Sequence, residues 1–398
     1  MENKKSFNNL LFFLFCLAFF FAPISLFVEQ GASFIDFIPA FILFAVFTFF
    51  SKKRKLSFFK NGLFFIILFL FFLCLSCLSN GTLFDNARVV LTFALFIVFY
   101  FLFASIDYSE KNVKTFIICF SLFAILSSLL IVLSTVFKKP YAFSRYSFDI
   151  IGVIKNPNYI VTFILCPFAY FTYSIFFNKR IRFSFRMLLI LCDILFLSAF
   201  ICSGTRSCVL TAAVVLILCF LKAIFSLKHI FRSLAILVGT IVLIVLFVNI
   251  APQFVPQETL NRIRIDALLQ EENNIRAIMW KDTFTYFLSR EPILGLGING
   301  SGKYSNALYG YILHNIPLQI VIDSGFAGSL IMAAFLITLV VRVKRKRIYF
   351  FAVIFASLFV PLLFINGLYA VNFWFFIYIT TFFVNNQDSL MGGKSFER

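Results

Sequence analysis

Long apolar runs alternate with short polar segments along the whole chain, and this alternation predicts a helical membrane protein. A helix needs about 20 mainly apolar residues to cross a bilayer. We therefore predict an all-α fold, a polytopic transmembrane bundle of about 12 spans. The expected spans are 10–28, 34–50, 62–78, 88–105, 113–137, 159–177, 187–203, 207–225, 233–250, 316–341, 348–365 and 369–384.

Positive charge supports this division of the chain. Lys and Arg gather in four clusters between apolar runs: "SKKRK" (51–55), "NKRIRFSFR" (178–186), "LKHIFR" (227–232) and "RVKRKR" (342–347). Cytoplasmic loops of membrane proteins are enriched in Lys and Arg. With the N-terminus inside and twelve crossings, all four clusters face the cytoplasm. We expect both termini to be cytoplasmic in an inner membrane, and the long loop to lie outside.

Composition excludes a soluble domain. Hydrophobic residues form 62% of the chain and charged residues 13%, with a mean hydropathy of +0.99, whereas soluble domains carry about 25% charged residues. The net charge of +18 lies in loops between spans, so we expect membrane lipid and no nucleic acid as a partner. The nine cysteines lie in or beside apolar runs, and we expect neither a metal site nor another cofactor.

A transporter is the alternative from another functional class. Such proteins often consist of two similar halves with ionisable groups inside their spans. The chain shows no clear internal repeat, and Asp193 in "LLILCDILFL" is the clearest ionisable residue deep in a span. Both features count against transport.

The pattern divides the chain into three parts: spans 1–9 in residues 1–250, a long outer loop at 251–315, and spans 10–12 with a cytoplasmic tail at 316–398. The loop is formally neutral, with six basic and six acidic residues. Its segment 258–292 predicts an amphipathic helix, because Arg276, Trp280, Phe284 and Phe287 share one face. Arg276 either pairs with Glu272 one turn earlier or binds phosphate through its fork of donors.

The loop ends in two further features. "GLGINGSG" (295–302) matches G-x-G-x-x-G but follows a helix rather than a strand, so it predicts a tight turn that folds back over the bundle. His314, one of two histidines, precedes the apolar run 316–341. It is either a hydrogen-bonded structural residue or a group for proton transfer, since its usual pKa of about 6.5 lies near neutrality.

Other cations are expected on the same outer face. Arg206 lies in the turn of "ICSGTRSCVL" (201–210), Arg145 and Lys155 lie in the loop before span six, and Arg88 begins span four. Several cations without matching acids in these short loops suit an anionic head group, with phosphate or diphosphate as the best candidate.

Four segments, in this order, resemble the bacterial O-antigen ligase and O-antigen polymerase superfamily. They are "IKNPNYI" (154–160), "SGTRSCVL" (203–210), "NIRAIMWKDTFTYFLSREPILGLGING" (274–300) and "HNIPLQIVIDSGFAGSL" (314–330). The resemblance covers residues 145–330, about half of the chain.

The resemblance implies a periplasmic glycosyltransferase that needs neither nucleotide sugar nor metal. Its donor would be a glycan on undecaprenyl diphosphate, and its acceptor another carrier-linked glycan (polymerase) or lipid A core (ligase). A polymerase is slightly favoured, since the outer loops lack an added basic cluster, and a chain-length regulator is a further candidate partner. The transporter alternative would then move the lipid-linked glycan across the membrane. Arg206 and Arg276 look like the diphosphate-binding arginines and His314 like the catalytic histidine. The candidate substrate-binding residues are Arg88, Arg145, Lys155, Asn156, Asn158, Trp280 and Asn315.

Overall fold

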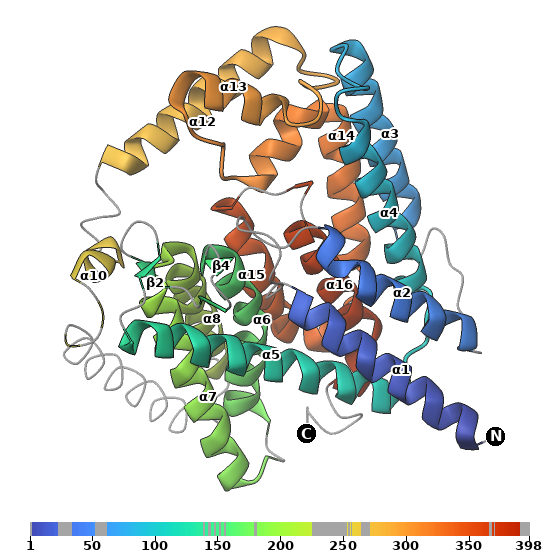
Figure 1. Cartoon of the computed structure of the whole chain (residues 1–398), viewed down its shortest axis with the longest axis vertical. Coiled ribbons are helices and arrows are strands. Elements are labelled where there is room, and N and C mark those ends of the chain that lie inside the picture. Colours follow the sequence, from blue (N-terminus) through green and yellow to red (C-terminus); the bar gives the residue numbers. More distant parts are fainter. Residues whose placement is uncertain are drawn as a thin grey trace.

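A computed structural model gives the fold as an assembly of helices (Figure 1). It describes residues 2–22, 34–51, 62–137, 140–141, 145–146, 149–150, 153–154, 157–178, 181–224, 253, 255, 257–263, 271–365, 368–369 and 371–390. The helices of the first part are α1 (Glu2–Phe21), α2 (Phe34–Phe50), α3 (Leu63–Ser79), α4 (Ala87–Ala104), α5 (Glu110–Val136), α6 (Pro157–Phe177), α7 (Phe183–Cys202) and α8 (Arg206–Ile224). The later helices are α10 (Gln257–Ile263), α12 (Glu271–Arg290), α13 (Gly300–Tyr309), α14 (Ile316–Val340), η4 (Arg345–Arg347), α15 (Ile348–Phe359), η5 (Val360–Leu363), α16 (Val371–Asn385) and α17 (Gln387–Leu390).

The helical fold class is confirmed. Seven helical segments within the described residues are long and apolar enough to cross a membrane, and four shorter apolar helices accompany them. Eleven of the twelve predicted spans fall on these segments, and the run 233–250 lies outside the described residues. The number of twelve crossings therefore stays a prediction. Short antiparallel strands add two small hairpins: β1 (Pro140–Tyr141) with β2 (Arg145–Tyr146), and β3 (Asp149–Ile150) with β4 (Val153–Ile154).

Aromatic rings fill the interior between the apolar helices. Phe19 of α1 stacks on Phe375 of α16 with ring centroids 5.3 Å apart, and Phe116 of α5 stacks on Phe382 at 3.7 Å. Trp374 of α16 is fully buried and stacks on Phe96 of α4. These rings bury large apolar areas and give α16 a central place among α1, α4 and α5.

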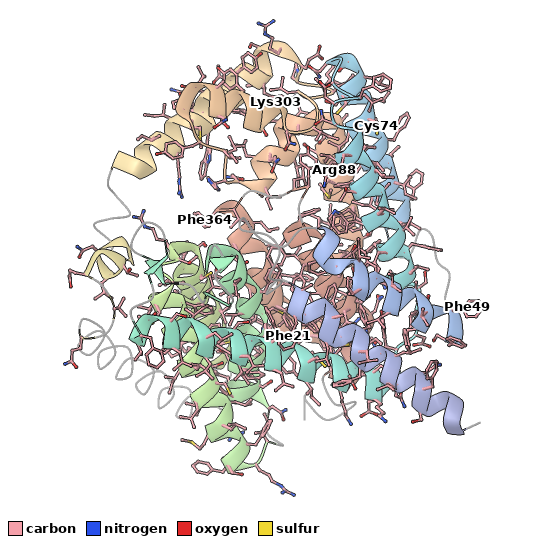
Figure 2. All side chains as sticks on the ribbon, viewed as in Figure 1. Phe21, Phe49, Cys74, Arg88, Lys303 and Phe364 are labelled. Atoms are coloured by element: carbon pink, nitrogen blue, oxygen red, sulfur yellow. The ribbon has the colours of Figure 1, made fainter. Side chains whose placement is uncertain are left out.

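Helices α12 and α13 lie together at one end of the molecule, beside the start of α14 (Figure 1). Figure 2 shows Lys303 of α13 and Arg88 of α4 toward that end, and Phe364 farther from it. Helix α14 then runs beside α3 through the apolar body. Residues of the predicted long loop thus come into contact with a helix that is long enough to span a membrane.

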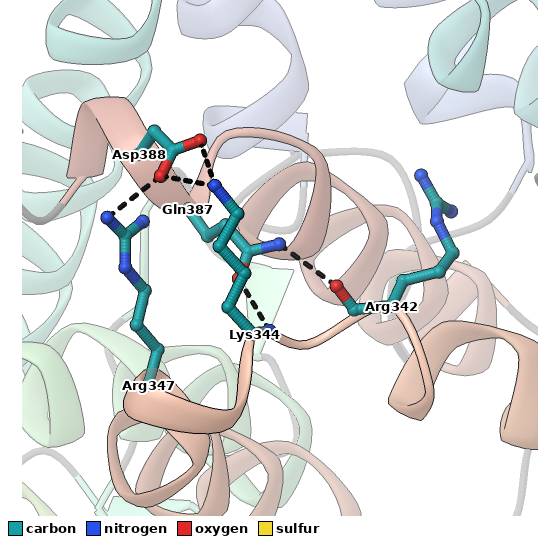
Figure 3. A network of polar contacts seen from close by, with 5 residues as sticks. All are labelled: Arg342, Lys344, Arg347, Gln387 and Asp388. Atoms are coloured by element: carbon teal, nitrogen blue, oxygen red, sulfur yellow. Dashed lines mark hydrogen bonds and ion pairs between the residues drawn. The ribbon is translucent and has the colours of Figure 1, made fainter.

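A polar network holds the other end of α14 (Figure 3). Gln387 of α17 donates to the carbonyl of Arg342 and accepts from the backbone N–H of Lys344, both at 3.0 Å. Asp388 accepts from Lys344 at 2.6 Å and from Arg347 at 2.8 Å. Hydrogen bonds and ion pairs therefore connect the basic cluster at 342–347 to α17.

One carboxyl group inside the bundle has a hydrogen-bond donor on a neighbouring helix. Asp193 in α7 is buried and accepts a hydrogen bond of 2.9 Å from the hydroxyl of Thr172 in α6. This contact ties α6 to α7 and gives the buried carboxyl group a donor.

Candidate functional site

The amphipathic face predicted for α12 packs against the start of α14. Phe287, Leu313 and Ile322 form a small buried cluster, and Trp280 and Phe284 pack against it. We call this cluster the loop core; its other partly buried members are Leu296, Leu318 and Val321. It lies apart from the main apolar core, so the long loop carries its own hydrophobic contact with α14.

Helix α13 is fastened to α12 by tyrosines. The rings of Tyr286 and Tyr304 stack with centroids 3.9 Å apart, and the Tyr309 hydroxyl donates to the carboxylate of Asp282. That hydrogen bond raises the pKa of Tyr309, because it favours the protonated hydroxyl. The two helices therefore form one unit above α14.

Helix α14 is interrupted at Gly325, and residues 292–297 fill the interruption. Gly325 has φ 67° and ψ −177°, which breaks the helical hydrogen-bond ladder. The backbone N–H groups of Leu296 and Gly297 donate to the carbonyls of Ile322 and Asp323, at 2.9 and 3.1 Å. Those of Phe326 and Ala327 donate to the carbonyls of Pro292 and Ile293, at 2.9 and 3.2 Å. We call residues 292–297 the docking segment.

Glycine is required on both sides of this contact. A Cβ on Gly325 would lie 2.1 Å from the carbonyl oxygen of Ile293, and one on Gly295 would lie 2.4 Å from the nitrogen of Gly325. Both residues also have positive φ angles, which glycine adopts at little cost. The turn predicted from "GLGINGSG" is thus present, and the glycines let two backbones meet.

Asp323 links the docking segment to three other elements. Its carboxylate accepts from the backbone N–H of Ser301 at the start of α13 and from the hydroxyl of Tyr369, both at 2.8 Å. Its carbonyl accepts from the Ser76 hydroxyl of α3 at 3.0 Å. The residue is fully buried, and it caps α13 in the manner of an N-terminal carboxylate. The sequence pattern did not single out Asp323, although an ionisable residue inside an apolar run such as 316–341 is itself a signal for a functional site.

Residues at the C-terminal end of α3 contact the docking segment and the residue that follows it. Asn80 donates to the carbonyl of Gly295 at 3.0 Å, and the Cys77 sulfur accepts from the backbone N–H of Ile298 at 3.3 Å. Cys77 is therefore a buried packing residue with a weak acceptor role. Within the residues that the structure describes, no three His, Cys, Asp or Glu side chains come together as metal ligands.

His314 lies two residues before the start of α14 and has a left-handed backbone conformation. Its φ is 49°, a region that few non-glycine residues occupy. Before it, the indole N–H of Trp280 donates to the carbonyl of Leu313 at 2.7 Å. After it, the side chain of Asn315 caps α14 by accepting from the backbone N–H of Leu318 at 3.0 Å. The histidine is thus held by partners on both sides in the sequence.

Arg276 and His314 come close enough to interact electrostatically. Burial, with a smaller contribution in the same direction from the charge of Arg276, lowers the pKa of His314 from 6.5 to about 4. Removing water from an imidazolium and placing a cation beside it both disfavour the charged form. His314 is therefore a neutral imidazole at neutral pH, able to accept a proton. The side chain of Glu272 lies outside the described residues, so the alternative pairing for Arg276 is not tested.

The other candidates are placed less completely. Arg206 begins α8 and is partly buried and engaged in an interaction, and its convergence with Arg276 and His314 stays a prediction. Arg88 is exposed in the first turn of α4. Arg145 belongs to β2 and Asn158 to α6, but their side chains lie outside the described residues, as do Lys155 and Asn156 entirely. Trp280 and Asn315 make the two backbone hydrogen bonds beside His314.

One comparison with known proteins covers this region. Residues 191–333 match a family model described as O-Antigen ligase. The matched segment begins in α7 and includes Arg206, all of α12 and α13, His314, and α14 beyond its break. No curated protein is similar enough to this chain to match it.

Proposed function

We propose that this chain is a membrane glycosyltransferase of the O-antigen ligase and polymerase superfamily that acts on lipid-linked glycan; the match of residues 191–333 to the O-Antigen ligase family model supports this proposal. The donor is a glycan on a polyprenyl diphosphate such as undecaprenyl diphosphate, and the acceptor is a hydroxyl group of a second glycan. The observation that carries the proposal is the pairing of Arg276 with a neutral, partly buried His314.

The reaction is a substitution at the anomeric carbon of the donor sugar. The acceptor oxygen forms a bond to this carbon while the bond to the diphosphate oxygen breaks, and the diphosphate leaves with the electron pair. Arg276, with Arg206 as the second arginine, stabilises the charge that develops on the leaving group. His314 takes the proton of the acceptor hydroxyl, a contribution of about 10²–10⁴-fold in such reactions.

The electrostatics around His314 suit this order of events. Burial, with a smaller contribution from Arg276, keeps His314 neutral, so the base is ready before the donor arrives. A bound diphosphate then places negative charge beside both groups, which offsets the arginine and favours the imidazolium that forms as the proton moves. Donor binding therefore strengthens the base at the stage where it is needed.

We also propose which side of the membrane the site faces and which part of the chain forms the loop. The site faces the periplasm, with residues 251–315 as the loop that carries Arg276 and His314 and both termini in the cytoplasm. The basic cluster at 342–347, at the opposite end of α14, supports this orientation, because such clusters stay on the cytoplasmic side.

Polymerisation of repeat units is the first candidate, with another carrier-linked glycan as acceptor and a chain-length regulator as a candidate partner. Ligation to lipid A core is the second, and the description of the matching family model favours it. The remaining candidate substrate contacts, from Arg88, Arg145, Lys155, Asn156 and Asn158, belong to the same proposal.

Deletion of the gene and analysis of carrier-linked glycans separates these candidates. Single repeat units on the carrier indicate a polymerase, whereas full-length chains that remain on the carrier indicate a ligase. Purified protein in vesicles should then transfer glycan from the lipid diphosphate. Unaltered glycan in the deletion strain, or movement of the lipid across vesicles without transfer, would refute the proposal.

A further inference from the structure

The backbone at His314 requires an external restraint. A φ of 49° is an uncommon conformation for a residue with a Cβ, and nearby extended conformations are more favourable for an isolated chain. The following residue, Asn315, is fixed by its cap to Leu318, but this bond acts on the start of α14. Another contact must therefore set the peptide plane in front of His314.

Trp280 supplies this contact. Its indole N–H donates to the carbonyl of Leu313 at 2.7 Å, and that carbonyl belongs to the peptide plane between Leu313 and His314. The orientation of this plane changes with the φ angle of His314. A hydrogen bond to the carbonyl therefore restrains φ of the histidine directly. The buried side chain of Leu313 in the loop core fixes the same residue a second time.

The same side chain also sets the position of Arg276. Arg276 and Trp280 lie four residues apart on α12, so their side chains lie on the same face of the helix. Trp280 fixes this face against the 313–314 peptide, and the guanidinium one turn earlier then lies near the imidazole. One hydrogen bond thus determines both the conformation of the histidine and its distance from the arginine.

We propose that Trp280 is the positioning residue of the site: it holds His314 in its left-handed conformation and brings Arg276 beside it. The proposal rests on the proposed function for its effect on transfer, although the geometric part is independent of it. Because the indole N–H is already donated to Leu313, Trp280 acts through His314 and Arg276 and has no donor left for substrate.

The chain contains a matched control, because it has only two tryptophans. Trp374 is fully buried in α16, and its indole N–H has no hydrogen-bond partner among the described residues. Trp280→Phe and Trp374→Phe both remove an indole, but only the first removes a hydrogen bond from the described structure. Replacement of Trp280 by 3-benzothienylalanine keeps the ring shape and substitutes sulfur for N–H, in case Trp280→Phe fails to insert.

The first measurement needs no substrate. Modification of His314 by diethyl pyrocarbonate requires the neutral imidazole, so its rate against pH, followed by mass spectrometry of the peptide, gives the pKa of His314. In the wild-type protein we expect about 4. In Trp280→Phe and the benzothienyl protein we expect the pKa to rise toward 6.5 and the limiting rate at higher pH to increase, because the imidazole leaves its buried place beside Arg276. Trp374→Phe should match the wild type.

The second measurement is transfer by the purified protein. A displacement of about 1 Å can cost about 10²-fold in rate, so Trp280→Phe and the benzothienyl protein should lose kcat by about that factor with an unchanged KM. A wild-type pKa and rate of His314 modification in both proteins would overturn the positioning role, even in an active enzyme. If the wild type transfers no glycan, the proposed function fails and the modification profile alone decides the positioning role.

Discussion

Replacement of Gly325 by Ala tests the docking segment, which holds the long loop to α14. An added Cβ would lie 2.1 Å from the carbonyl oxygen and 2.5 Å from the carbonyl carbon of Ile293. Both are backbone atoms, so the docking segment itself must move. The φ and ψ angles of 67° and −177° also belong to a region that is essentially restricted to glycine.

The expected magnitude follows from the four interlocking backbone hydrogen bonds. At about 1 kcal/mol each, they stabilise the docked state by about 4 kcal/mol. Since about 1.4 kcal/mol corresponds to a factor of ten, their loss should speed hydrogen exchange by about 10³-fold. The amides to follow are those of Leu296, Gly297, Phe326 and Ala327, which donate these bonds.

Hydrogen exchange measured by mass spectrometry on the purified protein resolves this effect. Gly310→Ala is the matched control, because Gly310 also has a φ of 67° but no atom lies within 4 Å of its Cβ position. Gly310→Ala should change exchange only near the end of α13. Unchanged protection of the Phe326 and Ala327 amides in Gly325→Ala would refute the account of the helix break.

Three further predictions follow from the contacts around the site and at the other end of α14. Asp323→Ala should lower the free energy of unfolding by about 2–4 kcal/mol, because Ser301 N–H and the Tyr369 hydroxyl lose their acceptor. Tyr369→Phe, measured in the same thermal unfolding series, should lower the free energy of unfolding by less. Arg276→Ala should raise the pKa of His314 above about 4 but leave it below 6.5, since burial is the larger cause. Because activity falls as His314 is protonated, the acid limb of the pH–rate profile should move to higher pH. An unmoved limb would contradict the interaction between Arg276 and His314. Asp388→Asn should lower the free energy of unfolding by about 1 kcal/mol, a modest loss because Asp388 is 64% exposed although its partner Arg347 is only 5% exposed. As a control, Glu110→Gln, which breaks the exposed ion pair with Lys114, should leave the unfolding midpoint unchanged.

Sequence pattern alone predicted the elements whose periodicity is strong. The apolar runs within the described residues are helical, and the face of Trp280, Phe284 and Phe287 on α12 packs in the loop core as the spacing indicated. These features depend on residues close together in the chain, which is why hydrophobic spacing identifies them.

The break in α14 was not predictable in this way. "DSGFAG" lies within a continuous apolar run, and a glycine there also fits an unbroken helix. The break is stable because carbonyls of Pro292 and Ile293, some thirty residues earlier, satisfy the freed N–H groups. Asp323 escaped notice for a related reason, since its partners Ser301 and Tyr369 come from distant segments. Arg206 and His314 are likewise far apart in the sequence, and their convergence stays a prediction.

The central claim is that Arg276 and neutral His314 carry out glycan transfer, and release of polyprenyl diphosphate by the purified protein tests it most directly. The wild-type protein, given a lipid-diphosphate glycan and an acceptor, should release the carrier diphosphate in step with product formation. His314→Ala and Arg276→Ala should each lower this rate by about 10²-fold or more while the protein still inserts in the membrane. A wild-type rate of release in either variant would contradict the account.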